Sequence, residues 1–347
     1  MHFGVFLEFP VSNGGTQRDA FQESFALVDE AERLGVDSVW LPEYHFNSGR
    51  VLSAPMTTAS AIAARTERIR IGLGVQCLPL GHPVRMAEEA ATVDLISGGR
   101  LEFGVGRGTF PNVHEGYNVP FSDSRGRFEE FLEVIFKAWT TDRFSFDGEF
   151  YSCQDLIVEP KPLQQPHPPI RVGVTSAESF PIVGRMGYPI MINPSRVFTL
   201  ADLAIHIQEY RKAWQAAGHK GASEVGLRVP VYVAETAERA YEDPRESAIF
   251  MAQRLGQRVS GYSDYAGTTG DWRGQGEQIL GMSYDDWLRD KVVYGTAEAV
   301  TERLQQLVQD LDLDQIIYEI NSGNKLSYEH QVTSLRLFNQ HVVPQFK

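Results

Sequence analysis

The chain has 347 residues, a mass of 38.9 kDa and a formal net charge of −13. Hydrophobic residues make up 42% and charged residues 22% of the sequence, which is typical of a globular protein with one large core. The negative charge argues against nucleic acid and anionic lipid, because both bind basic surfaces, and favours a small-molecule partner.

The remaining composition excludes several protein classes. Only two cysteines are present, Cys77 and Cys153, without the Cys and His spacing of a zinc site or a disulfide framework. The start MHFGVFLEFP enters a strand-like run directly, without the regions of a signal peptide. No window approaches the ~20 apolar residues of a membrane span. We therefore expect a cytoplasmic protein with no membrane segment and no bound metal.

Short β-rich runs alternate with segments of helical periodicity, which predicts βα units around a parallel sheet. The expected strands are 2–9, 38–41, 69–75, 101–105, 170–174, 189–192, 225–233 and 315–319. The expected helices are 18–34, ended by Gly35, then 55–65, 84–96, 125–139, 200–217 and 296–311. An aromatic run at 144–150 indicates an inserted hairpin. Together these elements predict a single-domain α/β fold over residues 1–347, a (β/α)₈ TIM barrel with insertions.

Residues 259–282 are rich in glycine and polar side chains and lack sustained periodicity. We expect this stretch to be a mobile loop that acts as a lid, with an insertion of no function as the alternative.

The side chains just past the strand ends of a parallel barrel meet at one mouth. Ionisable groups follow the second, third and fourth strands there: Glu43, Tyr44, His45, His82, Arg107 and His114. Four of them could supply oxygen and nitrogen ligands to a metal, namely Glu43, His45, His82 and His114. Their sequence spacing matches no common metal motif, so this interpretation is disfavoured.

The fourth strand ends in FGVGRG, residues 103–108. This spacing differs from the GxGxxG fingerprint of dinucleotide-binding folds, and no acidic residue is placed to hold a ribose. The glycines Gly104, Gly106 and Gly108 let a flat ligand lie against the backbone, or serve only a tight turn.

Arg107 and Arg125 present guanidinium groups suited to clamping a phosphate. After the fifth strand, GVTSAES places the hydroxyls of Thr175, Ser176 and Ser179 at the start of a helix. Hydroxyls at that position either cap the helix or bind phosphate. Together with the two arginines, they favour phosphate binding.

With these residues in place, the sequence resembles the bacterial luciferase-like flavin monooxygenases, with the closest likeness to the luciferase α chain and related alkanal monooxygenases. The resemblance rests on FGVFLEF near the start, GVDSVWLPEYHF at 35–46, the ungapped tract 78–108, and GVTSAES. It implies reduced FMN at the barrel mouth, with the phosphate held by Arg107, Arg125, Ser176 and Ser179. Backbone groups near Thr175 and Ala177 would assist.

The same resemblance assigns further positions around the flavin. It places Gly74 and Val75 at a non-prolyl cis peptide beside the ring. It places Gly106 where luciferase has a reactive cysteine, so that the glycine leaves more room. The main departure is that Tyr44 stands where the family has its catalytic histidine, which favours oxygen transfer over light emission. We expect Tyr44 to donate a hydrogen bond to the oxygenated flavin and His45 to be the acid/base candidate.

The expected reaction uses FMNH₂ from a separate flavin reductase. O₂ adds at the flavin C4a position, and the resulting peroxide oxygenates a small organic substrate. The alternatives are a dehydrogenase that uses the deazaflavin F420 and a protein that only stores FMN. The resemblance also implies a homodimer formed through the helices beside the second and third strands, and it leaves the substrate open.

Overall fold

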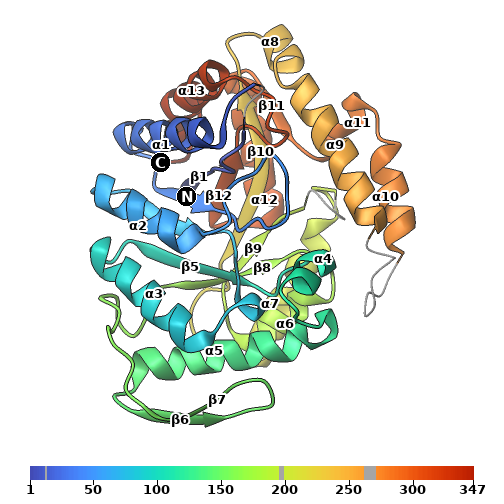
Figure 1. Cartoon of the computed structure of the whole chain (residues 1–347). Helices are drawn as coiled ribbons and strands as arrows, with labels where there is room; N and C mark the ends of the chain where they lie inside the picture. The colour runs from blue at the N-terminus through green and yellow to red at the C-terminus, as the bar shows by residue number, and fades with distance from the viewer. Residues whose placement is uncertain (12–13, 195–198, 262–270) are drawn as a thin grey trace.

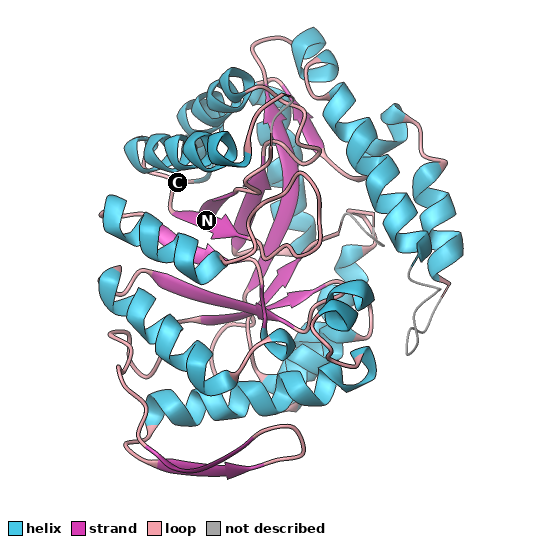
Figure 2. Cartoon of the chain, in the orientation of Figure 1, coloured by secondary structure: helices cyan, strands magenta, loops and turns pink. Residues whose placement is uncertain are grey.

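In the computed structural model, the described residues are 1–11, 14–194, 199–261 and 271–347. Eight parallel strands form the barrel: β1 His2–Phe6, β2 Ser38–Leu41, β3 Arg70–Leu73, β5 Leu101–Gly106, β8 Ile170–Val174, β9 Ile190–Ile192, β10 Val225–Val233 and β12 Gln315–Glu319. The barrel is closed because β1 pairs with both β2 and β12, and β10 pairs with both β9 and β12. Figure 2 shows the strands inside and the helices around them. The predicted (β/α)₈ barrel is therefore confirmed.

The observed strands follow the predicted ones, with differences at the ends of four of them, of which those of β5 and β9 amount to a single residue. The first strand ends at Phe6, and Phe9 has a left-handed backbone with a φ of 51°. The third strand ends at Leu73, before the Gly74–Val75 peptide bond, which is cis. A further short strand, β4 Gln76–Cys77, then pairs with β5.

Helices surround the barrel: α1 Gln17–Leu34, α2 Pro55–Arg65, α3 Pro83–Ile96, α5 Ser124–Thr140, α6 Ser179–Met186, α7 Leu203–Ala216, α12 Ala297–Leu311 and α13 Tyr328–Leu337. Their boundaries follow local chemistry, as α1 shows. Thr16 and Asp19 form a capping box at its start, and Gly35 ends it with a left-handed φ of 73°. No helix among the described residues is long and apolar enough to cross a membrane.

The interior of the barrel is filled by a cluster of Phe6, Trp40, Met191 and Ile317, with Val75 packed against it. Trp40 is fully buried and donates a hydrogen bond from Nε1 to Ser38 Oγ at 2.8 Å. A Cβ added at Gly4 would lie 2.6 Å from Nε1 of this indole, so the glycine makes room for it. The cluster fills the inside of the barrel, and the large cavity lies at its mouth.

The predicted hairpin is present as β6 Phe144–Asp147 and β7 Ser152–Leu156, an antiparallel pair. Its second strand continues beyond the expected end at residue 150. The hairpin lies outside the barrel, below α5 in Figure 1.

The segment between β10 and β12 is largely helical, and it corrects the prediction of a loop over 259–282. It contains α8 Ala237–Glu242, α9 Arg245–Ser260, α10 Trp272–Leu280, α11 Tyr284–Asp290 and the short strand β11 Val293–Gly295. The helices α9, α10 and α11 lie together on one flank of the barrel (Figure 1). Residues 262–270 of the predicted loop lie outside the described residues.

One of the glycines that suggested a loop, Gly276, is a contact residue between two helices. A Cβ at Gly276 of α10 would lie 2.6 Å from the carbonyl oxygen of Gly256 on α9, and a Cβ at Gly256 would lie 2.9 Å from the carbonyl oxygen of Gly276. Without side chains at these positions, the two backbones approach closely. The close packing of α10 on α9 thus offsets the low helix propensity of glycine.

Candidate active site

A cavity of about 820 Å³ opens at the mouth of the barrel, where the strand ends meet α9 and α10. Ten of the predicted site residues line it: Tyr44, Gly74, Val75, Gly106, Arg107, Arg125, Thr175, Ser176, Ala177 and Ser179. These residues come from the ends of β2, β3, β5 and β8 and from the starts of α5 and α6. The fold therefore brings positions that are far apart in the sequence to a single cavity.

Two guanidinium groups stand at one end of the cavity. Arg107 follows β5 and lies over the ring of Phe121 at 5.3 Å. Its pKa is lowered, first by burial and then by the charge of Arg125. Arg125 is about half exposed and lies 3.3 Å from Glu178. Because the two cations repel each other, an anion bound between them would be stabilised.

Among the hydrogen bonds of the described residues, none from the hydroxyls at the start of α6 caps that helix. Its N-cap residue is Glu178, which makes no side-chain capping bond. Ser176 Oγ and Ser179 Oγ instead share a hydrogen bond of 2.6 Å. The described hydrogen bonds thus do not support capping as the reason for these hydroxyls. They lie at the positive end of an eight-residue helix, on the cavity wall that also carries Arg125.

The glycines near the end of β5 have different roles. A Cβ at Gly106 would lie 2.5 Å from Cγ2 of Val75, so the space that the sequence suggested was free for a ligand is occupied by Val75. Gly173 makes room for the same side chain, with its added Cβ 2.7 Å from Val75 Cγ1. Gly108 has a φ of 78°, which requires a glycine in a turn. Val75, carried by the cis peptide that the resemblance implied, therefore forms part of the cavity floor.

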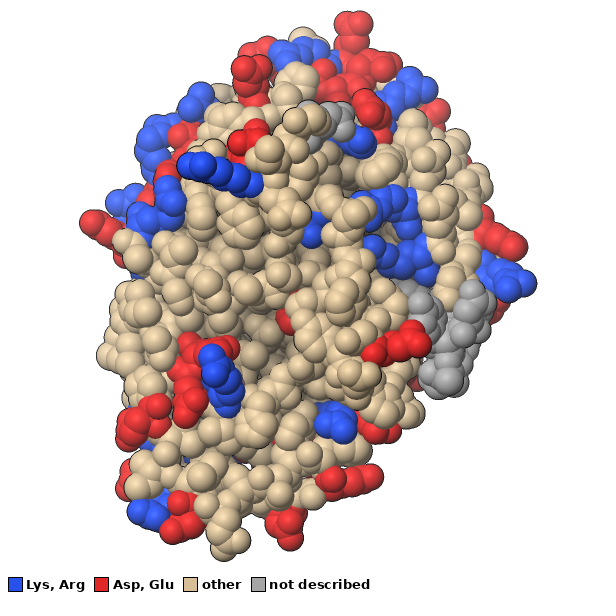
Figure 3. Space-filling model, in the orientation of Figure 1, with Lys and Arg blue, Asp and Glu red and all other residues tan. Residues whose placement is uncertain are grey.

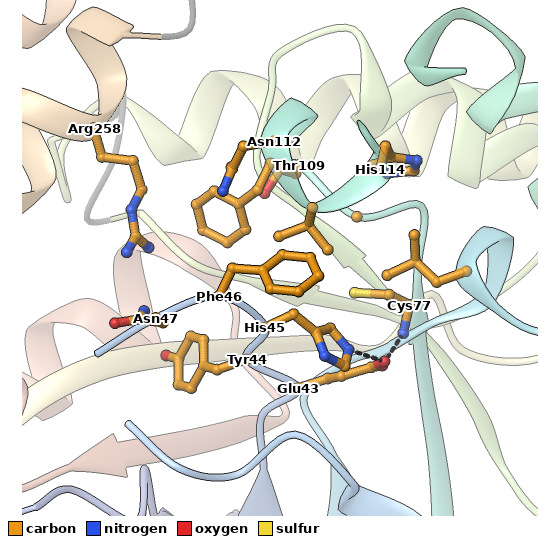
Figure 4. Close-up of a pocket in the computed structure, with 14 residues that line it drawn as sticks. Glu43, Tyr44, His45, Phe46, Asn47, Cys77, Thr109, Asn112, His114 and Arg258 are labelled. Atoms are coloured by element: carbon orange, nitrogen blue, oxygen red, sulfur yellow. Dashed lines mark hydrogen bonds and ion pairs between the residues drawn. The ribbon is translucent and has the colours of Figure 1, made fainter. Parts of the chain in front are cut away.

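His45 faces a small pocket of about 30 Å³ beside the main cavity (Figure 4). Its Nε2 lies 2.7 Å from Glu43 Oε1, and its Nδ1 lies 3.0 Å from the hydroxyl of Tyr117. The other oxygen of Glu43 accepts hydrogen bonds from the backbone N–H of Cys77 at 2.6 Å and from Gln76 at 2.7 Å. Both imidazole nitrogens are thus occupied by protein groups, and the structure does not place His45 in the large cavity.

Tyr44 lines the large cavity, and its hydroxyl donates a hydrogen bond to Glu8 Oε1. The guanidinium of Arg50 lies over its ring at 4.9 Å. Burial, aided by the charge of Glu8, raises the pKa of Tyr44 to about 12. Because its one hydroxyl hydrogen is directed at Glu8, Tyr44 offers the cavity an acceptor oxygen. Donation to a flavin-bound group, the role expected of Tyr44, would require this hydrogen to leave Glu8.

Comparison with known proteins identifies the family. The family model described as luciferase-like monooxygenase matches residues 1–315. The chain belongs to this family. The oxygenase component of the flavin-dependent trigonelline monooxygenase of Acinetobacter baylyi is 27% identical to it, over 100% of this chain and 96% of that protein.

Two further comparisons agree with the family. The FMNH(2)-dependent dimethylsulfone monooxygenase of Pseudomonas putida is 27% identical, over 92% of this chain and 86% of that protein. The crystal structure of monooxygenase RslO1 from Streptomyces bottropensis superposes with a TM-score of 0.83 at 25% identity, covering 100% of both chains. The protein is thus a luciferase-like, flavin-dependent monooxygenase.

This luciferase-like monooxygenase also has a buried charge cluster that the sequence reasoning missed. Glu8 Oε2 lies 2.7 Å from Arg50 Nη2, and Glu8 Oε1 lies 3.3 Å from Arg228 Nη2. Arg228 also contacts Glu319 at 2.6 Å. Arg50 and Arg228 line the cavity, with the two carboxylates behind them. The sequence does indicate a buried charge at one position, because Arg228 interrupts the apolar strand sequence VGLRVPVYV.

The four side chains considered as metal ligands do not form a metal site in this monooxygenase. Within the described ranges, no group of three or more His, Cys, Asp or Glu residues could hold a metal ion. His114 is 1% exposed, with Nε2 directed at Gly108 and its ring against Phe121 at 5.2 Å. Its pKa is lowered by burial, which favours a neutral imidazole behind Arg107.

Proposed function

We propose that this monooxygenase binds reduced FMN in the 820 Å³ cavity and uses it with O₂ to oxygenate a small organic substrate. The observation that carries the proposal is the anion-binding end of the cavity. There, Arg107 and Arg125 repel each other, and Ser176 and Ser179 place paired hydroxyls at the start of α6. This donor set fits a phosphate, since it combines two guanidinium groups with hydroxyls at a helix N-terminus.

The roles of the other residues follow from their positions. Gly74, Val75 and Gly106 line the part of the cavity that would receive the isoalloxazine ring, and backbone groups near Thr175 and Ala177 would assist at the phosphate. Bound FMNH₂ supplies the electrons that activate O₂. Tyr44 presents an acceptor oxygen to the cavity, where it orients a group that carries a proton. Helices α9 and α10 cover one side of the cavity and limit the access of water.

The electron supply would come from a separate flavin reductase. The trigonelline enzyme is named as an oxygenase component, and the dimethylsulfone enzyme is named as FMNH₂-dependent. Both names support a reductase as the partner of this protein. We further propose a cytoplasmic homodimer formed through α2 and α3. The side chains of Leu95 and Ile96 on α3 are 44% and 49% exposed, which suits a helical contact surface.

The function is tested by anaerobic titration followed by admission of isotope-labelled O₂. We expect FMNH₂ to bind with a stoichiometry of one per chain and reduced F420 to bind at least ~10-fold more weakly, a difference of about 1.4 kcal/mol. With a flavin reductase and a panel of small organic compounds, charged and uncharged, labelled oxygen should appear in a product. Tighter binding of reduced F420 would favour a dehydrogenase. FMN binding without labelled product from any substrate would favour a storage protein.

Tyr44→Phe is expected to lower the turnover of the monooxygenase by about 10- to 100-fold, because it removes a hydrogen-bonding group from the cavity. FMN affinity should be unchanged. Since the pKa of Tyr44 is raised to about 12, its hydroxyl is protonated at neutral pH. The loss should therefore be equal at about pH 6 and about pH 9. Steady-state kinetics measure this, with Tyr241→Phe on α8 as the control. A loss that grows between the two pH values would contradict the assignment.

A further inference from the structure

The cavity has a second polar wall, across the barrel from the proposed phosphate site. Arg107 follows β5 and Arg228 lies on β10, and three strand pairings separate β5 from β10 by the shorter route around the barrel. Arg50 and Arg258 line this second wall with Arg228. In Figure 4, Arg258 reaches from α9 toward the side of the site that holds Tyr44 and Asn47.

Arg228 is held so that one nitrogen of its guanidinium, Nη1, remains available. Its Nε and Nη2 donate to Glu319 at 3.1 and 2.6 Å, and Nη2 also donates to Glu8 at 3.3 Å. The group lies over the ring of Phe6 at 3.5 Å, which fixes its plane. Within the described part of the chain, Nη1 makes no hydrogen bond, and the residue, which is 8% exposed, lines the cavity. Nη1 therefore offers donor hydrogens from a buried, oriented cation.

The charges around Nη1 of Arg228 favour an anion. Arg50 and Arg228 are balanced by Glu8 and Glu319, so the buried cluster alone has no formal net charge. Arg254 and Arg258 on α9 add positive charge to this cluster. The pKa of Arg254 is lowered, first by burial and then by the charges of Arg50 and Arg258, which shows that these guanidinium groups act on one another.

Two further observations point the same way. Burial raises the pKa of Glu319, which makes its negative charge easier to neutralise. The surface in Figure 3 shows Lys and Arg side chains gathered beside α9 and α10, although the whole chain has a net charge of −13. The second wall is thus a local positive region on an acidic protein.

We propose that Arg228 and Arg258 bind a carboxylate of the organic substrate, which assigns small organic acids as the substrate class. The apolar part of such an acid would lie against Met251, Leu255 and Trp272, which line the same side of the cavity. A carboxylate carries a full negative charge and accepts charge-assisted hydrogen bonds, so it fits the available Nη1 of Arg228 and the nearby guanidinium of Arg258 better than a neutral carbonyl does. This inference rests on the proposed function, because it assigns the opposite wall to the phosphate of FMN.

The test compares acids with their uncharged amides. Benzoate, hexanoate, benzamide and hexanamide are titrated by calorimetry into the whole protein, with and without saturating oxidised FMN. We expect each acid to bind at least ~10-fold more tightly than its amide, both with and without FMN. Equal affinities of acid and amide would overturn the proposal. So would loss of benzoate binding on saturation with FMN, because benzoate would then occupy the flavin site.

Variants locate the binding site. Arg258→Gln should weaken benzoate binding at least ~10-fold and leave the affinities for benzamide and FMN unchanged. Arg228→Lys, which keeps the charge facing Glu319 but loses the donor Nη1, should act in the same direction. The control is Arg245→Gln on the same helix, where the arginine pairs with Glu242 at the surface. If Arg258→Gln has no more effect than this control, the carboxylate site is not at α9. If FMN fails to bind but acids are still preferred over amides, the proposed cofactor fails and the anion site stands.

Discussion

Arg107→Ala is expected to weaken FMN binding about 100-fold, close to 3 kcal/mol, and to leave riboflavin binding unchanged. Arg107 is the more enclosed of the two cavity guanidiniums proposed to hold the phosphate, and hydrogen bonds to charged groups contribute about 1.5–3 kcal/mol each. Riboflavin has the same ring and ribityl chain but no phosphate. Fluorescence titration of both flavins therefore separates loss of a phosphate contact from general damage to the cavity.

Arg125→Ala should also weaken FMN binding and leave riboflavin binding unchanged. The loss of FMN affinity should be smaller than for Arg107→Ala, because Arg125 is about half exposed and pairs with Glu178. Arg85→Ala is the matched control, since this arginine of α3 is exposed and pairs with Glu89 in its own helix. The phosphate assignment would be abandoned if Arg107→Ala left FMN affinity intact, or if riboflavin affinity fell as far as that of FMN.

Glu8→Gln is expected to lower the free energy of unfolding by about 3–5 kcal/mol. The carboxylate of Glu8 is 2% exposed and contacts the guanidiniums of Arg50 and Arg228. Its neutralisation leaves two buried cations with Glu319 as their remaining anion. A buried charge without its partner pays its desolvation cost without compensation. Urea unfolding at neutral pH, followed by circular dichroism, measures the difference.

Glu89→Gln is the control for the loss of a carboxylate, because the exposed pair of Glu89 with Arg85 should contribute less than about 1 kcal/mol. The double variant Glu8→Gln with Arg50→Met should lose less than the sum of the two single variants, since each removes the same ion pair. If Glu8→Gln proved no less stable than Glu89→Gln, the cluster would not contribute to the fold, and its arginines would be better explained by ligand binding alone.

The sequence alone determined the barrel and one half of the site. The strand prediction succeeded because strands buried on both faces read as short apolar runs, and β8, β10 and β12 have the predicted bounds. The phosphate candidates could be chosen because side chains that follow parallel strands must meet at one mouth. That rule needs only the order of the elements along the chain, and it placed Arg107 and Ser176 on one cavity.

The tertiary structure alone decided which partner each polar side chain meets. Tyr44 became an acceptor toward the cavity only because Glu8, 36 positions away, takes its hydrogen. His45 was directed into a smaller pocket because Glu43 and Tyr117 hold both of its nitrogens. Helix α10 formed where the sequence suggested a loop, because Gly256 and Gly276 gain close packing from their missing side chains. Hydrogen bonds and close packing between distant segments leave no periodic trace in a sequence, whereas burial along a strand does.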